Sequence, residues 1–126
     1  MDEYLAALHN LDLARSQKQF AEDATVFHHG GGVLTRIDSS DEWRKVQEET
    51  YAAIKAMTAK EGRTTPPYHD VHARDLRVQM LSPEAAVATF QTPNPGFVRR
   101  YSLAFAKRNG VWKIVHMHIS RRNTPK

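Results

Sequence analysis

The sequence predicts an α+β fold, with two or three helices packed on one face of a curved antiparallel sheet. Two observations support this prediction. Apolar residues at helical spacing are confined to the first half of the 126-residue chain, and the second half holds four strand-like runs joined by very short turns. Successive strands joined so tightly must be antiparallel neighbours. A chain of this length closes around one core, so residues 1–126 are expected to form a single domain.

The first quarter of the chain contains two helix candidates and a short strand. Tyr4, Leu8 and Leu11 lie at helical spacing and form one apolar stripe. Asp12 is a good N-cap for a second helix, which is expected to bury Phe20 and to end near residues 21–23. Residues 24–28 are then expected to form a strand that runs into three glycines at 30–32, with a further short strand at 33–37.

The best-specified helix begins after Ser39. Ser39 and Glu42 form a capping-box pattern, in which the serine side chain accepts from the first turn of a helix. Gly62 is a suitable C-terminal stop. The apolar face of this helix is expected to carry Trp43, Val46, Thr50, Ala53, Ile54 and Met57.

Four strands are expected to follow the stiff linker at residues 63–67. Of the turns between them, Asn109-Gly110 is the most specific, because both residues accept the positive φ angles of a type I′ hairpin. The expected strands are residues 68–81, 85–92, 97–107 and 111–121.

Composition excludes several classes of function. The chain has no cysteine, so disulfides, thiolate chemistry and cysteine-based zinc sites are absent, and a reducing cytoplasm is the expected compartment. No apolar run approaches the ~20 residues that span a bilayer, so no membrane partner is expected. Residues 1–62 carry 7 basic and 11 acidic side chains, whereas residues 63–126 carry 11 and 3. A basic half could attract nucleic acid, but without a recognised motif no nucleic-acid partner is expected.

Three stretches resemble a known superfamily. They are QFAEDATVF at residues 19–27, DLRVQMLSPEAAVATF at 75–90 and KRNGVWKIVHMHIS at 107–120. Together they are similar to the nuclear transport factor 2-like superfamily, and most closely to its SnoaL-like and ketosteroid-isomerase-like branch. The last stretch also resembles the association domain of calcium/calmodulin-dependent protein kinase II. The resemblance implies a cone-shaped sheet wrapped around a long helix, with an apolar pocket at the open end.

The resemblance also implies a pocket protein for small molecules. An ungapped match puts His28 where ketosteroid-isomerase-like enzymes carry their base and Tyr4 where they carry an oxyanion donor. This implies an acid–base isomerase or cyclase acting on a small, mostly apolar carbonyl compound. One departure is Ser102, which stands where those enzymes carry a protonated acid. From the residues alone, the commoner outcome is structural, with Tyr4 in the core face of a helix and His28 hydrogen-bonded in a strand. The alternative function is a non-enzymatic ligand-binding or dimeric assembly module.

The remaining pocket residues come from the same match. The register implied by the family puts an apolar set inside the pocket with a small residue opposite, and an arginine at the rim where a carboxylate could bind. These expected ligand-binding residues are Phe27, Arg100, Ser102, Val115, Met117 and Ile119.

His116 and His118 lie two residues apart and therefore share one face of the last strand. Such a pair could chelate a metal, but no acidic residue nearby completes a ligand set, so neither metal nor cofactor is expected. The family register puts both histidines on the outer face of the sheet, which commonly pairs with a second subunit. The expected assembly is accordingly a homodimer. Trp43 and Trp112 are expected to be packing anchors.

Overall fold

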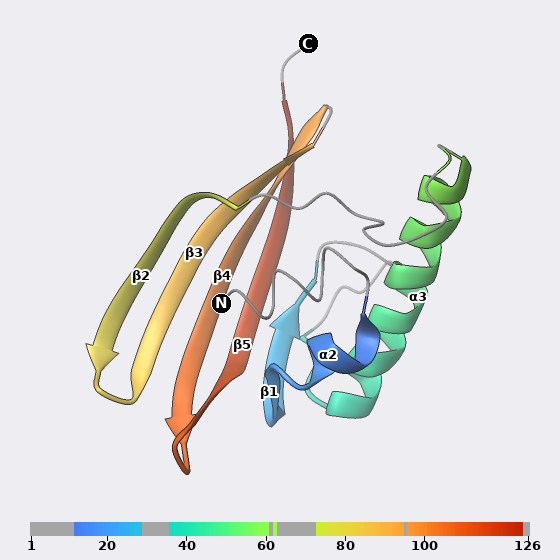
Figure 1. Cartoon of the computed structure of the whole chain (residues 1–126). Helices are drawn as coiled ribbons and strands as arrows, with labels where there is room; N and C mark the ends of the chain where they lie inside the picture. Colours follow the sequence, from blue (N-terminus) through green and yellow to red (C-terminus); the bar gives the residue numbers. More distant parts are fainter. Residues whose placement is uncertain (1–11, 29–35, 61, 63–72, 95, 125–126) are drawn as a thin grey trace.

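The structure is a computed structural model that describes residues 12–28, 36–60, 62, 73–94 and 96–124. It confirms the α+β class: two helices lie to one side of a five-stranded sheet (Figure 1). The expected first helix with Tyr4, the triglycine and residues 33–35 lie outside the described residues. Among the described residues, no helix is long and apolar enough to cross a membrane.

The sheet has the strand order β1-β5-β4-β3-β2 and is curved without closing on itself (Figure 1). Neighbouring strands from β2 to β5 pair antiparallel, as expected from their short turns. The first strand pairs with β5 in parallel, which requires a long connection between the two strands, and α3 and β2 to β4 lie between them in the sequence. The strands are β1 Phe20–Phe27, β2 Arg74–Ser82, β3 Ala85–Asn94, β4 Phe97–Arg108 and β5 Val111–Asn123.

The helix α2, Leu13–Gln17, begins at the expected cap, where Asp12 Oδ1 accepts a hydrogen bond from the backbone N–H of Arg15 at 3.1 Å. It is shorter than predicted, and Phe20 belongs to β1 instead of the helix. The backbone N–H of Ile114 donates to the carbonyl oxygen of Gln19 at 2.7 Å. The chain is therefore already tied to β5 where the sequence pattern alone suggested another helical turn.

The long helix α3, Ser40–Lys60, is capped as predicted, since the N–H of Glu42 donates to Ser39 Oγ at 3.1 Å. Its C-terminal stop is also confirmed: Gly62 has a φ of 89°. The buried face differs in part from the expected stripe. Gln47 and Tyr51 are buried beside Trp43, whereas Ala53 is exposed.

The hairpin between β4 and β5 has the predicted turn. Asn109 has a φ of 53° and Gly110 a φ of 77°, the two positive angles that a type I′ turn requires. At the other sheet edge, β2 begins at Arg74, six residues later than the strand predicted from Tyr68, and residues 63–72 lie outside the described part of the chain.

The two faces of the sheet differ in what covers them. The helix-covered face is defined by Val26, Leu103 and Met117, which are paired across β1, β5 and β4 and are almost completely buried with Trp43 and Tyr51 of α3. The open face carries the alternate residues of the same strands. It is defined by Thr25, Phe27, Ser102, Ala104, His116 and His118.

Candidate functional site

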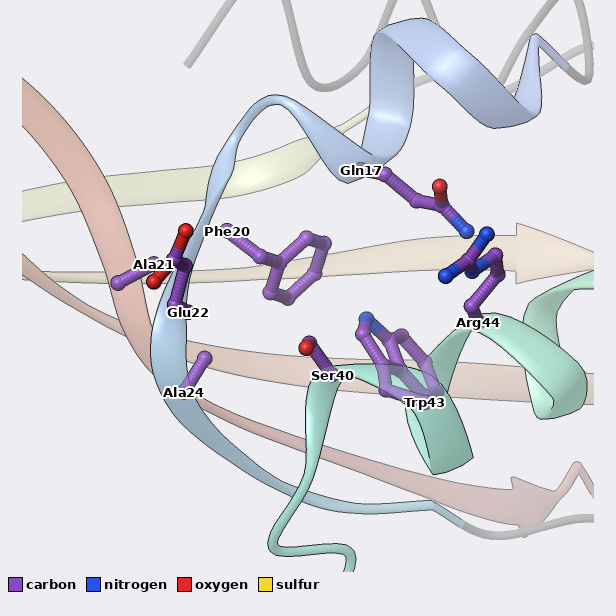
Figure 2. Close-up of a pocket in the computed structure, with 8 residues that line it drawn as sticks. All are labelled: Gln17, Phe20, Ala21, Glu22, Ala24, Ser40, Trp43 and Arg44. Carbon is purple, nitrogen blue, oxygen red and sulfur yellow. The ribbon is translucent and has the colours of Figure 1, made fainter.

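A cavity of about 340 Å³ lies between α2, the first half of β1 and the first turn of α3 (Figure 2). Its walls come from three segments of the chain that are separate elements of the fold. These segments lie on the helix side of the sheet, next to its β1 edge (Figure 1). The lining residues are Gln17, Phe20, Ala21, Glu22, Ala24, Ser40, Trp43 and Arg44.

The cavity lies where β1 loses register with β5. Phe20 pairs with Ile114 and Thr25 pairs with His116, so five residues of β1 run alongside only two of β5. The extra residues cannot all keep ladder positions, and they bend away from the partner strand. Asp23, within this bend, forms an ion pair of 2.8 Å with Arg108, and this hydrogen bond lowers the pKa of the carboxyl group. The ion pair ties the bend to the end of β4.

Two aromatic rings form the apolar wall. The rings of Phe20 and Trp43 meet edge to face, with centroids 5.5 Å apart and planes inclined by 66°. Trp43 is only 6% exposed and Ala24 is equally buried. The geometry is that of an attractive aromatic pair, so the wall is a fixed surface against which an apolar group can pack.

Two buried donors near this wall have no hydrogen-bond partner in the part of the chain that the structure describes. They are the indole Nε1 of Trp43 and the amide Nε2 of Gln17. Figure 2 shows the indole nitrogen on the side of its ring that faces Phe20 and Gln17. Buried donors in folded proteins are nearly always satisfied, by protein, water or ligand. These two groups are therefore suited to donate hydrogen bonds to an oxygen atom of a bound molecule.

Other polar groups around the cavity already have partners. The guanidinium of Arg44 pairs with Asp41 at 3.1 Å, one helical turn away. Next to Gln17, the hydroxyl of Ser16 accepts a hydrogen bond of 2.9 Å from Gln47. Burial raises the pKa of Tyr51 to about 12, so its phenol is neutral at physiological pH. Charge inside the site is thus limited to the mouth, where Glu22 and Arg44 are exposed.

His28 lies at the end of β1, and its ring is 5.7 Å from the ring of Trp43, centroid to centroid. It is half-buried and lies on the helix side, next to the wall of the cavity but outside its lining. Tyr4, its expected partner, lies outside the described residues.

The structure divides the other expected pocket residues between the two faces of the sheet. Met117 and Ile119 belong to the buried core on the helix-covered face, with Met117 only 1% exposed. Val115 is half-buried and occupies a bulge, since Ala104 pairs with His116 and Phe105 with Ile114. The inward register predicted for β5 therefore applies to Met117 and Ile119, and the bulge interrupts it at Val115.

Strand pairing corrects the inward placement expected for Phe27 and Ser102 and the rim position expected for Arg100. Ser102 pairs with His118 and Arg100 with Ser120, which puts both residues on the open face. Tyr101 and Leu103 take the inward positions of β4 instead, one residue out of step with the expected register. Phe27 is 43% exposed and lies on the open face as well. These three residues cannot share one cavity with Met117.

The two histidines lie on the open face, as the sequence predicts. Their rings flank Phe27, with centroid distances of 5.7 Å for His116 and 5.6 Å for His118. His116 Nδ1 and the hydroxyl of Thr25 share a hydrogen bond of 2.7 Å. Partial burial lowers the pKa of His116, with His118 adding to the effect. Among the described residues, no group of three or more His, Cys, Asp or Glu side chains could hold a metal ion.

A family model described as the SnoaL-like domain matches residues 1–123 of this chain. The chain belongs to the SnoaL-like domain family. The match covers nearly the whole sequence, which confirms the resemblance found in the three quoted stretches. No curated protein sequence matches the chain.

Several solved structures share the fold of this chain. An NTF2-like protein of unknown function from Pseudomonas putida superposes with a TM-score of 0.72 at 16% identity, covering 94% of this chain and 79% of the other. A candidate calcium/calmodulin dependent protein kinase II association domain from Xanthomonas campestris gives 0.69 at 17%, covering 99% and 83%. A protein from Novosphingobium aromaticivorans provisionally named a scytalone dehydratase gives 0.68 at 14%, covering 100% and 83%. At these identities the likeness shows the fold alone.

The cavity of this SnoaL-like domain was not predicted from its sequence. Trp43 was expected to be a packing anchor, and Phe20 was placed on a helix, so the two rings were not brought together. A usable signal is present, because Gln17 and Phe20 are large residues near the end of one expected helix and Trp43 is near the start of the next. What the sequence does not display is the loss of register in β1 that opens space between them.

Proposed function

We propose that this SnoaL-like domain binds a small, mostly apolar molecule with a carbonyl oxygen in the cavity between α2, β1 and α3. Ligand pockets commonly have volumes of about 300–1,000 Å³, apolar walls and a few placed polar groups. The cavity matches that description in its volume of about 340 Å³ and in its wall of Phe20 and Trp43. The observation that carries the proposal is the buried indole N–H of Trp43, which lacks an acceptor among the described residues.

The test titrates acetophenone into the protein and monitors binding by NMR at the indole N–H resonances. The chain has two tryptophans, and Trp112, which is 39% exposed on β5, serves as an internal control. We expect the Trp43 resonance to shift in a saturable way while that of Trp112 stays in place. Trp43→Phe keeps an aromatic wall but removes the donor, and should weaken binding about fivefold, the value of one neutral hydrogen bond. Equal shifts at both tryptophans, or an unchanged affinity, would contradict the proposal.

A second and more specific proposal is that the bound carbonyl compound undergoes a proton shift, with His28 as base and Tyr4 as oxyanion donor. It is favoured by the contact between His28 and Trp43, which puts an imidazole beside the cavity wall. A neutral imidazole can remove a proton α to a carbonyl, giving an enolate that a phenol stabilises, and can return that proton at another carbon.

This activity can be tested with 3-cyclohexenone, whose conversion to 2-cyclohexenone is followed by ultraviolet absorption. His28→Asn and Tyr4→Phe should each lower the rate about 100-fold, as removal of a general base or oxyanion donor does. His118→Asn, on the open face, is the matched control and should leave the rate unchanged. Retention of the wild-type rate in His28→Asn would exclude the base assignment.

The alternative proposal is a dimeric assembly module that uses the open face, in a cytoplasmic setting. This face has an exposed aromatic residue, Phe27, and small side chains such as Ala104, a combination that allows close approach of a second sheet. Ala104→Arg should convert a homodimer into monomers in sedimentation velocity. Ala53→Arg is the matched control, because it makes the same substitution at an exposed position of α3, away from the open face, and should not change the mass. If the wild-type chain sediments as a monomer at about 100 micromolar, this assembly is ruled out.

A further inference from the structure

Four arginines gather at one end of the β4–β5 hairpin, away from the cavity. Two of them, Arg99 and Arg121, lie over the ring of Phe97, the first residue of β4. The guanidinium carbon of Arg121 is 3.8 Å from the centre of the Phe97 ring, and that of Arg99 is 5.2 Å from it. Arg100 and Arg122 follow Arg99 and Arg121 in the sequence and take the alternate positions of the same strands.

The pairing of these arginines is unfavourable for the fold by itself. Arg99 and Arg121 are direct partners across the antiparallel β4–β5 ladder, where like charges destabilise a sheet. No ion pair forms at any of the four arginines within the described residues. Arg100 Nε donates a hydrogen bond to Ser120 Oγ at 3.1 Å. Four positive charges are therefore concentrated at this end of the hairpin, and no described acidic side chain pairs with them.

The stacking on Phe97 leaves the binding edges of Arg99 and Arg121 available. A guanidinium over an aromatic ring uses its flat face for the cation–π contact, whereas its N–H groups project from its edge. Those edges form a planar fork that matches the oxygens of a phosphate or carboxylate group. Phe97 thus restricts the position of both guanidiniums without using their donors.

We propose that Arg99 and Arg121 form a binding site for a phosphate group, organised by Phe97. Two cations at paired strand positions match the double negative charge of a phosphate better than the single charge of a carboxylate. The bound anion would also remove the repulsion between the two arginines. The site shares no residue with the cavity, so it goes beyond the proposed function and stands or falls independently of it.

The experiment uses inorganic pyrophosphate as the probe, titrated into the full chain at low salt and followed by NMR at the backbone amides of Phe97, Arg99 and Arg121. Arg99→Gln and Arg121→Gln should each weaken binding at least tenfold. Arg122→Gln is the matched control, because it removes the same charge from the adjacent position on the open face, and should weaken binding less than threefold. Equal losses in all three variants would reduce the site to diffuse attraction and overturn the proposal.

Two further measurements test the site, one of thermal stability and one of anion selectivity. Pyrophosphate should raise the melting temperature of the wild type but not that of Arg99→Gln, and a shift in both would overturn the site. Succinate should bind at least tenfold more weakly than pyrophosphate, and equal binding would overturn the assignment to phosphate. Arg121→Lys keeps the charge but loses the planar fork, and is expected to behave like Arg121→Gln.

Discussion

The side-chain amide of Gln47 donates a hydrogen bond of 2.9 Å to the hydroxyl of Ser16, and both side chains are buried. The bond joins α2 to α3 directly beside Gln17 and one helical turn from Trp43, two residues that line the cavity. The relative position of the two helices, and hence the width of the cavity between them, depends on this contact. The same serine hydroxyl also contacts Tyr51.

Ser16→Ala is expected to lower the free energy of unfolding by about 1–3 kcal/mol, because the buried amide of Gln47 then has no acceptor. Urea denaturation followed by circular dichroism measures this. A double variant that also carries Gln47→Leu should recover part of the loss, since both polar groups are then removed. If the double variant is simply the sum of two losses, the hydrogen bond does not couple the helices.

Gly110→Ala is expected to destabilise the protein by about 1 kcal/mol, because Gly110 has a φ of 77°, at which an alanine side chain is strained. The urea midpoint should fall without a change in the slope of the transition. Asn109→Gly is the control, as glycine adopts the φ of 53° found there without strain. A loss as large for Asn109→Gly as for Gly110→Ala would show that the turn side chain itself matters.

Leu103→Ala should cost about 2–5 kcal/mol, because Leu103 is completely buried at the centre of β4 and its removal leaves a cavity in the core. Leu81→Ala provides the matched control: it is the same substitution at a position on β2 that is 70% exposed, and should change stability by less than about 0.5 kcal/mol. Thermal unfolding of the two variants gives the comparison. Similar melting temperatures would contradict the packing described for the helix-covered face.

Protonation of His116 should destabilise the folded chain. Burial lowers the pKa of His116 in the folded state below the ordinary value of 6.5, and the charges of His118 and Arg36 lower it further. The unfolded chain then binds the proton more readily, so stability is expected to fall as the pH drops from 6.5 toward the folded pKa. Unfolding midpoints at several pH values measure the slope. His116→Asn should flatten it. A slope unchanged in His116→Asn would assign the effect to other groups.

Much of the fold could be predicted because its signals are local. The cap at Ser39, the turn at Asn109-Gly110 and the four later strands each follow from residues close together in the sequence. The faces of β4 and β5 were harder. A single bulge at Val115 reverses which residues point inward, and Ser102 consequently lies on the open face. Such a bulge depends on pairing between strands, which one sequence does not display.

The candidate site was predicted less well than the fold, for a related reason. His28 lies on the helix side, in contact with Trp43, but the cavity itself depends on Phe20 belonging to β1. Local propensity favoured a longer helix there, and the hydrogen bond from Ile114 to Gln19 outweighs it. Contacts between residues almost a hundred positions apart thus decide the shape of the site.

Between Phe20 and Thr25, five residues of β1 run beside only two of β5, so the length of this segment of β1 can change without breaking an existing register. Elsewhere in the sheet, one inserted residue would turn every following side chain to the wrong face. Between Phe20 and Thr25 the chain is already out of step, so an added or deleted residue can be absorbed in the bend while Val26 keeps its place opposite Met117. Loop-length engineering at this point offers a way to enlarge or shrink the cavity without redesigning the core around it.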